Sequence, residues 1–235
     1  MRKTKKTSLG LIAASLMALS LTAPAVVSAA TATTTGDVTF TKPTNAVNPV
    51  NPTDPTKPVD PVDPTNPATG QTGALTLDVA PVLPFGTHEI ESGSHTYALN
   101  ADASKGSVNK NPYLQVSDRR GVANDGQAQG WNVTVQMSDF TAASGAKLAG
   151  ASLAFKDATV KTATGDTSKA PAQQNIANLS SASSATTIFS AAKGQGLGTW
   201  LSVYDPANIE LTVPTPGEGA YTSTLTWTMN EGPTA

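Results

Sequence analysis

Apolar residues recur at every second position in several separate stretches of the chain. The first stretch is 75–79, and the others are 131–137, 209–213 and 221–229. Their apolar positions are Leu75, Leu77, Val79, Trp131, Val133, Val135, Met137, Ile209, Leu211, Val213, Tyr221, Leu225, Trp227 and Met229. A period of two places one face of a strand in a core and the other face towards water. We therefore predict a β-strand in each stretch.

Turn-forming residues separate these predicted strands. Pro, Gly, Asn and Asp cluster at 84–86, 124–126 and 214–217. Segment 162–197 is rich in Ala, Ser, Thr and Gln, and it is the one place where we expect a short helix or a long surface loop. The pattern predicts an all-β, antiparallel β-sandwich-like single domain over residues 71–235. A domain of about 165 residues buries roughly 70% of its unfolded surface.

Prolines occupy every third position between residues 49 and 67. Polyproline II has three residues per turn, so these prolines would stack along one edge of an extended rod. At ~3.1 Å per residue the stretch would span roughly 55 Å. We predict that residues 31–70 form a disordered, proline-rich spacer. A ligand for a proline-binding partner domain is the alternative, but no cations are placed to anchor such a partner.

The first thirty residues have the three-part pattern of a secretory signal peptide. Four cations up to Lys6 precede an apolar run from Leu9 to Leu21, and small residues end at Ala30. The run of roughly 13 residues matches the apolar region of a signal peptide. It is short of the ~20 residues of a membrane-spanning helix. We predict a signal peptide over residues 1–30 and export of the protein; an uncleaved N-terminal anchor is the alternative.

Charge and cysteine content exclude several classes of partner and cofactor. Without residues 1–30, the chain keeps eleven of its fifteen Lys and Arg against seventeen Asp and Glu, a formal net charge of −6. An acidic chain gives no electrostatic basis for binding nucleic acid. The sequence has no Cys, which excludes disulfides, cysteine-ligated metals and thiol nucleophiles.

Candidate catalytic and metal-binding groups are sparse. The two histidines, His88 and His95, are seven residues apart, which places them on opposite faces of a strand. The segment 118–126 contains Asp118, Arg119, Arg120, Asn124 and Asp125. It is either a calcium loop or a turn-rich surface connection, and its spacing favours the connection. Glycan hydrolysis needs only two carboxylates, so residue counts leave it open. We expect no enzyme activity, no metal and no cofactor.

Three blocks of residues resemble, in order, the WxL domain of Gram-positive surface proteins. They are GALTLDVAPVLPFGTHEI, YLQVSDRRGVANDGQAQGWNVTV from Tyr113 to Val135, and NIELTVPTPGEGAYTSTLTWTMNEGP from Asn208 to Pro233. In the third block Tyr221, Leu225, Trp227, Met229 and Pro233 follow the family spacing. Both WxL motifs depart from the family pattern at the third position, where Val133 and Met229 replace Leu.

The resemblance implies a module that attaches non-covalently to the cell wall, with peptidoglycan as the ligand class. It also implies a secreted protein at the cell surface, and partners among other WxL proteins and membrane-anchored WxL-interacting proteins. Some such proteins adhere to host extracellular-matrix proteins. The alternative function is therefore a subunit of a surface protein complex, or an adhesin, whose wall contact comes from its partners.

The motif residues have two interpretations. Trp131, Val133, Tyr221, Leu225, Trp227 and Met229 form the ligand-binding surface or, because they are in phase with other apolar residues, part of the core. Their phase favours the core. The binding surface then lies elsewhere, for example in the 118–130 loop.

Overall fold

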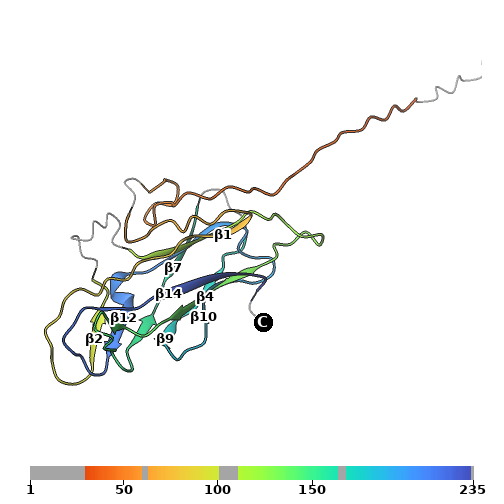
Figure 1. Cartoon of the computed structure of the whole chain (residues 1–235). Coiled ribbons are helices and arrows are strands. Elements are labelled where there is room, and N and C mark those ends of the chain that lie inside the picture. Colours follow the sequence, from red (N-terminus) through yellow and green to blue (C-terminus); the bar gives the residue numbers. More distant parts are fainter. Residues whose placement is uncertain (1–29, 60–62, 101–110, 164–167, 234–235) are drawn as a thin grey trace, which may run out of the picture. The chain divides into compact units, whose positions relative to one another are not determined.

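The structure is a computed structural model, and it describes residues 30–59, 63–100, 111–163 and 168–233 (Figure 1). The predicted signal peptide lies almost wholly outside these ranges. Residues 30–44 contain no helix or strand. The strands all belong to the unit that begins at Phe40.

Within the described residues the fold is all-β, as the sequence predicts. The helical element among these residues is a short 3-10 helix, η2, at Pro206–Asn208. The strands are β1 (Leu75–Val79), β2 (His95–Ala98), β3 (Tyr113–Asp118), β4 (Trp131–Met137), β5 (Thr141–Ala142), β6 (Ser152–Phe155), β7 (Thr159–Thr162), β8 (Ala172–Gln173), β9 (Ile176–Ser180), β10 (Thr186–Ala191), β11 (Gly198–Val203), β12 (Ile209–Val213), β13 (Tyr221–Thr222) and β14 (Leu225–Glu231).

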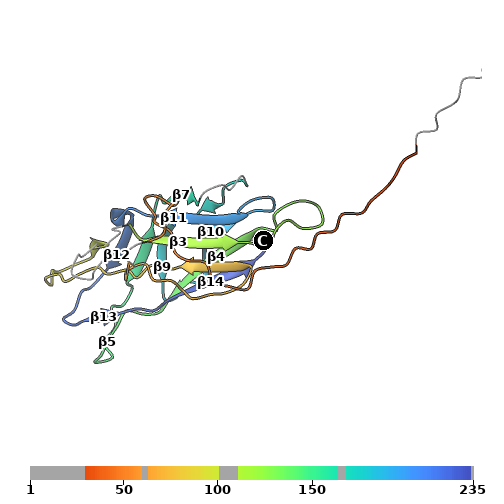
Figure 2. The ribbon, with the colours of Figure 1, turned by 90° about the horizontal axis from the view of Figure 1, so that it is seen from above.

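The strands form three four-stranded antiparallel sheets and one short pair. The first sheet has the order β1-β3-β11-β7, the second β14-β4-β10-β8 and the third β2-β12-β6-β9, and β13 pairs with β5. The first sheet lies over the second, and the third lies at one end of both (Figures 1 and 2). Inward side chains of all three sheets build one apolar core. Each stretch predicted from alternation contains a strand, although 221–229 is divided into β13 and β14. The stacked antiparallel sheets (Figure 1) confirm the sandwich-like fold class.

The expectation of a helix or long loop in segment 162–197 is wrong. The segment contains β8, β9 and β10, which bury Ile176, Leu179, Ile188 and Phe189. The pairing of β9 with β6 and that of β10 with β4 each have a register shift. Such an irregularity breaks the period of two, so alternation does not reveal these strands.

Residues 45–59 and 63–69, here called the belt, differ from the extended rod that their prolines predict. Three Asx-Pro-Thr sequences, beginning at Asn51, Asp54 and Asp63, form local turns. In each turn the side-chain oxygen accepts hydrogen bonds from the backbone N–H and hydroxyl of the Thr two residues on, for example at 2.9 and 2.7 Å for Asn51. Asx turns compete with the extended conformation.

The belt lies against the outer face of the first sheet. Gln115 accepts a hydrogen bond from the Val50 N–H at 2.8 Å and donates one to the Asn48 carbonyl at 3.1 Å. The side chain of Val50 packs on a small apolar cluster that includes Tyr113 and Leu201. With the core on one face and the belt on the other, every residue of β3 is buried.

Candidate functional site

The two tryptophan motifs lie on neighbouring strands of the second sheet. In the pairing of β14 with β4, Met229 stands opposite Val133, Trp227 opposite Val135 and Glu231 opposite Trp131. The two third positions of the motifs are therefore cross-strand partners, although 96 residues separate them in the sequence. The motifs form one continuous patch on one face of the sheet.

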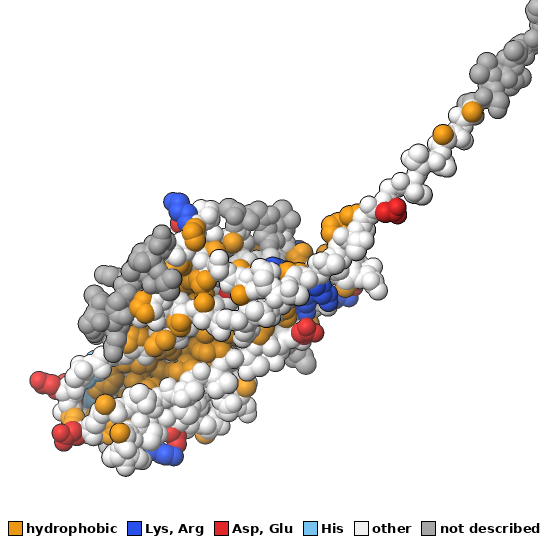
Figure 3. All heavy atoms as spheres, turned by 45° about the horizontal axis from the view of Figure 1, so that its top comes forward, with side chains coloured by type: hydrophobic (Ala, Val, Ile, Leu, Met, Phe, Trp, Pro, Cys, Tyr) orange, Lys and Arg blue, Asp and Glu red, His pale blue; other side chains and the backbone are white. Residues whose placement is uncertain are grey.

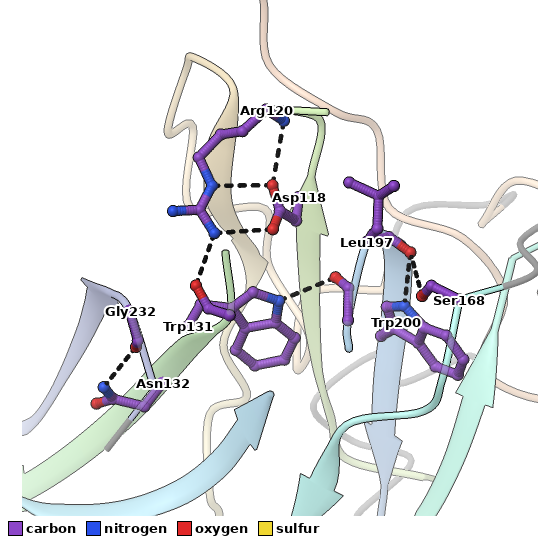
Figure 4. A network of polar contacts seen from close by, with 10 residues as sticks. Asp118, Arg120, Trp131, Asn132, Ser168, Leu197, Trp200 and Gly232 are labelled. Atoms are coloured by element: carbon purple, nitrogen blue, oxygen red, sulfur yellow. Dashed lines mark hydrogen bonds and ion pairs between the residues drawn. The ribbon is translucent and has the colours of Figure 1, made fainter. Parts of the chain in front are cut away.

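Trp131 belongs to the core. Its side chain is fully buried, and its ring meets Phe189 edge-on at a centroid distance of 5.0 Å. The indole Nε1 donates a hydrogen bond of 2.9 Å to the Gly196 carbonyl (Figure 4). A Cβ at Gly196, where φ is +72°, would lie 2.6 Å from this nitrogen. The core interpretation is therefore confirmed for Trp131, and Val133 beside it is also fully buried.

Asp118 and Arg120 form a buried ion pair next to Trp131, so they are not part of a surface loop. The Arg120 guanidinium donates to both Asp118 carboxylate oxygens, at 2.9 and 2.8 Å, and to the Gly130 carbonyl at 2.7 Å (Figure 4). Asp118 is the last residue of β3, and only 1% of its surface is exposed. This pair closes the base of the 119–130 loop and orders the start of β4.

The remaining predicted loop residues do not converge. Arg119 is partly buried and donates to the Gly73 carbonyl at 2.7 Å and to the Asn45 carbonyl. Asn124 and Asp125 are exposed. The pKa of Asp125 is lowered by its hydrogen bond with Lys193. The described part of the chain holds no group of three side chains that could ligate a metal ion.

Trp227 has a different environment from Trp131. It lies on β14, the edge strand of the second sheet, and is only partly buried. Its ring contacts Phe155 edge-on at a centroid distance of 6.1 Å. The rest of its surface faces a groove.

The groove has a volume of about 1270 Å³ and lies where the second and third sheets meet the loops at 80–90 and 214–224. Figure 3 shows hydrophobic side chains gathered in a hollow, with a histidine at one end. The apolar and aromatic side chains that line it include Leu83, Phe85, Tyr97, Phe140, Leu148, Leu153, Leu211, Val213, Tyr221, Leu225 and Trp227.

The groove carries little charge. Its acidic and basic lining residues are Glu89 and His88, and neither Lys nor Arg is among the described residues that line it. The His88 ring stacks on Tyr97 at a centroid distance of 4.0 Å and hydrogen-bonds to the Phe85 carbonyl at 2.7 Å. The histidine is thus held as a flat extension of the aromatic wall.

The structure separates the six predicted motif residues into two groups. Tyr221, Leu225 and Trp227 line the groove. Trp131 and Val133 lie in the core, and Met229 is partly buried against the core. Sequence analysis placed Leu211 and Val213 on a predicted strand, but it did not identify Phe85, Tyr97 or Phe140 as site residues. They come from different loops and strands, and the turn at 84–86 was the only local signal for any of them.

Comparison with known families gives one match. A family model described as "WxL domain surface cell wall-binding" matches residues 27–233. Neither the curated proteins nor the solved structures give a significant match. No helix in the described part of the chain is long and apolar enough to cross a membrane.

Proposed function

The chain belongs to the WxL family of surface cell wall-binding domains, and on this premise we propose that it attaches to the wall non-covalently by binding peptidoglycan in the groove. Family membership associates the protein with the cell surface and the wall. The observation that carries the finer proposal is the position of Trp227, a motif residue whose ring is partly open to an aromatic-lined groove.

The lining of the groove suits a sugar chain. Ligand sites are concave and mostly apolar, with a few polar groups that fix orientation. The aromatic side chains of Trp227, Tyr221 and His88 line the groove, with His88 stacked on Tyr97, and Thr87 and Asn100 add polar groups. Aromatic side chains combine a large apolar surface with a defined geometry, which fits the apolar faces of sugar rings.

The charge of the groove favours the glycan backbone over anionic wall polymers. A site for phosphate-rich polymers would be expected to carry Lys or Arg, whereas the charged groups among the described lining residues are Glu89 and, when protonated, His88. The negative net charge of residues 31–235 also disfavours binding of anionic wall polymers.

The proposal is a binding function without catalysis. Glycosidases place two carboxyl groups on either side of the scissile bond. The described lining of the groove includes one carboxylate, Glu89.

A protein partner at the surface is the second candidate function, and two exposed apolar residues favour it. Val82 and Ile90 border the groove and are 52% and 58% exposed. Contiguous exposed apolar surface marks sites of protein contact, and these two side chains extend the apolar lining of the groove. Such partners are other WxL proteins, membrane-anchored WxL-interacting proteins or a host extracellular-matrix protein.

Co-sedimentation with purified sacculi tests the proposal. Residues 30–235 are mixed with sacculi before and after removal of the secondary wall polymers, and at high salt. We expect pelleting to survive both treatments, and to be lost in Trp227→Ala while the circular dichroism spectrum is kept. Val122→Ala is the matched control, since Val122 is 57% exposed and does not line the groove. Pelleting that disappears with the secondary polymers contradicts the proposal.

A protein partner gives a different result in the same assay. The chain then fails to pellet with clean sacculi although it is folded, and pelleting returns when a surface extract is added.

A further inference from the structure

Among the described residues, no strand hydrogen-bonds to the outer edge of β14, although β1 lies near this strand. β14 is the terminal strand of the second sheet, seven residues long, and its pairing with β4 has no register shift. Its sequence, LTWTMNE, contains neither Pro nor Lys, and its one charge is at Glu231. Edge strands usually carry a bulge, a Pro or an inward charge that blocks further pairing. β14 carries none of these.

The hydrogen-bonding groups on this edge can be assigned to individual residues. The Ser138 N–H donates to the Thr224 carbonyl, and the Gly232 N–H donates to the Gly130 carbonyl. In an antiparallel ladder, alternate residues direct their backbone groups to opposite sides. The even-numbered residues of β14 therefore bond to β4, and the N–H and C=O groups of Leu225, Trp227 and Met229 face the open side.

The same three residues direct their side chains to the apolar side of the sheet, because they stand opposite Met137, Val135 and Val133. Leu225 and Trp227 line the groove. The edge thus combines free backbone groups with an adjoining apolar surface.

A segment of the same chain has the complementary features. Residues 37–41 are Asp-Val-Thr-Phe-Thr, with apolar side chains at alternate positions and Thr between them. These residue types favour strands. Val38 is 74% exposed and Phe40 is 89% exposed, and residues 30–44 contain no strand.

We propose that residues 37–41 pair as an additional strand with the open edge of β14 in a second copy of this chain. Addition of an extended segment to a sheet edge is a recurring mode of recognition, in which backbone bonds supply affinity and alternate side chains fill pockets. Val38 and Phe40 enter the apolar surface beside Leu225 and Trp227. In a single copy, neither residues 37–41 (the donor segment) nor the outer edge of β14 has a strand partner among the described residues. In a pair of copies, the donor segment of each can bind the β14 edge of the other.

The contact is small, so the association is reversible and depends on concentration. A segment of five residues buries much less than the ~1,200 Å² of a stable interface. The proposal does not rest on peptidoglycan binding, and it is measured without any wall material.

Sedimentation velocity and hydrogen exchange of residues 30–235 test the proposal together. The sedimentation coefficient is expected to rise as the protein is concentrated from the low to the high micromolar range. In dilute protein the amides of Leu225, Trp227 and Met229 exchange fast, while those of Thr226 and Thr228 are protected by β4. On concentration, the first three amides become protected.

Two matched variants identify the donor segment. Phe40→Asp, combined with Val38→Asp, is expected to abolish both the mass increase and the new protection. Thr39→Asp adds charge to the same segment on the opposite face of the strand and is expected to leave both intact. A mass that stays monomeric at every concentration overturns the proposal, as does association that leaves the β14 amides unprotected or is equally sensitive to Thr39→Asp.

Discussion

Replacing each motif tryptophan by alanine tests the separation of the two motifs into a core part and a groove part. Trp131 is fully buried, contacts Phe189 and donates a hydrogen bond to the Gly196 carbonyl. Truncation of a buried Trp costs about 3–5 kcal/mol of unfolding free energy. We therefore expect Trp131→Ala to lower the melting temperature by roughly 6–20 °C, at about 2–4 °C per kcal/mol for a domain of this size.

Trp227→Ala removes a smaller buried area. Trp227 is partly buried, and its described ring contact is with Phe155. We expect a loss of about 1–3 kcal/mol, made up of partial burial and one aromatic pair. The loss of wall binding is expected to be complete in this variant at a temperature where it is fully folded.

Urea unfolding followed by far-ultraviolet circular dichroism measures both losses, because tryptophan fluorescence is itself changed by the substitutions. Sacculus binding is then measured at a low temperature where both variants are folded. Trp131→Ala should keep binding and Trp227→Ala should lose it. The reverse result, or an equal loss of binding in two folded variants, would refute the separation of core and groove roles.

Three further substitutions test the surroundings of the motif. Gly196 has a φ of +72°, and in Gly196→Ala the new Cβ would lie 2.4 Å from the Ala191 Cβ. We expect thermal unfolding to show that the free energy of unfolding falls by at least about 1–3 kcal/mol, the cost of overpacking. Arg120→Ala leaves the Asp118 carboxylate buried without its partner, and we expect about 3–5 kcal/mol by urea unfolding. Burial raises the pKa of Asp78. The stability of the wild-type protein should therefore fall as the pH rises from the ordinary pKa of Asp through the raised pKa of Asp78. Asp78→Asn should make stability less dependent on pH over this range.

Each of these has a control or a contrary outcome. Gly121→Ala, at the same φ of +72° but with open space around it, isolates the backbone cost from the steric clash. Arg120→Ala combined with Asp118→Asn should recover part of the stability, because no unpaired charge is left. The folded state holds the proton of Asp78 more tightly than the unfolded state does, so stability decreases as the pH rises. Stability that rises over the same pH window contradicts the assignment.

The prolines at every third position are an example of a local pattern that the surroundings override. A period of three predicts a straight rod, but Asn51, Asp54 and Asp63 turn the chain, and Gln115 binds the backbone at Val50. Gln115 is 65 residues from Val50. Nothing in the spacing of prolines indicates that a side chain on a distant strand accepts a backbone hydrogen bond from this segment.

Alternation of apolar residues was sufficient to predict the all-β class and the strands at 75–79, 131–137 and 209–213, because the side-chain period of a strand is a local property of the backbone. The strand predicted at 221–229 is divided into β13 and β14. The motif spacing was likewise sufficient to identify the family. Strands with register shifts, such as β9 and β10, were not predictable in this way, because the shift depends on the partner strand.

The environments of Trp131 and Trp227 could not be predicted from the sequence. Both residues are in phase with their apolar neighbours, and both direct their side chains to the same face of one sheet. β4 lies between two strands, so Trp131 is covered on both sides, whereas β14 lies at the edge and leaves Trp227 open to the groove. Burial depends on what packs beside a strand, and the order of strands in a sheet arises from contacts between segments far apart in the chain.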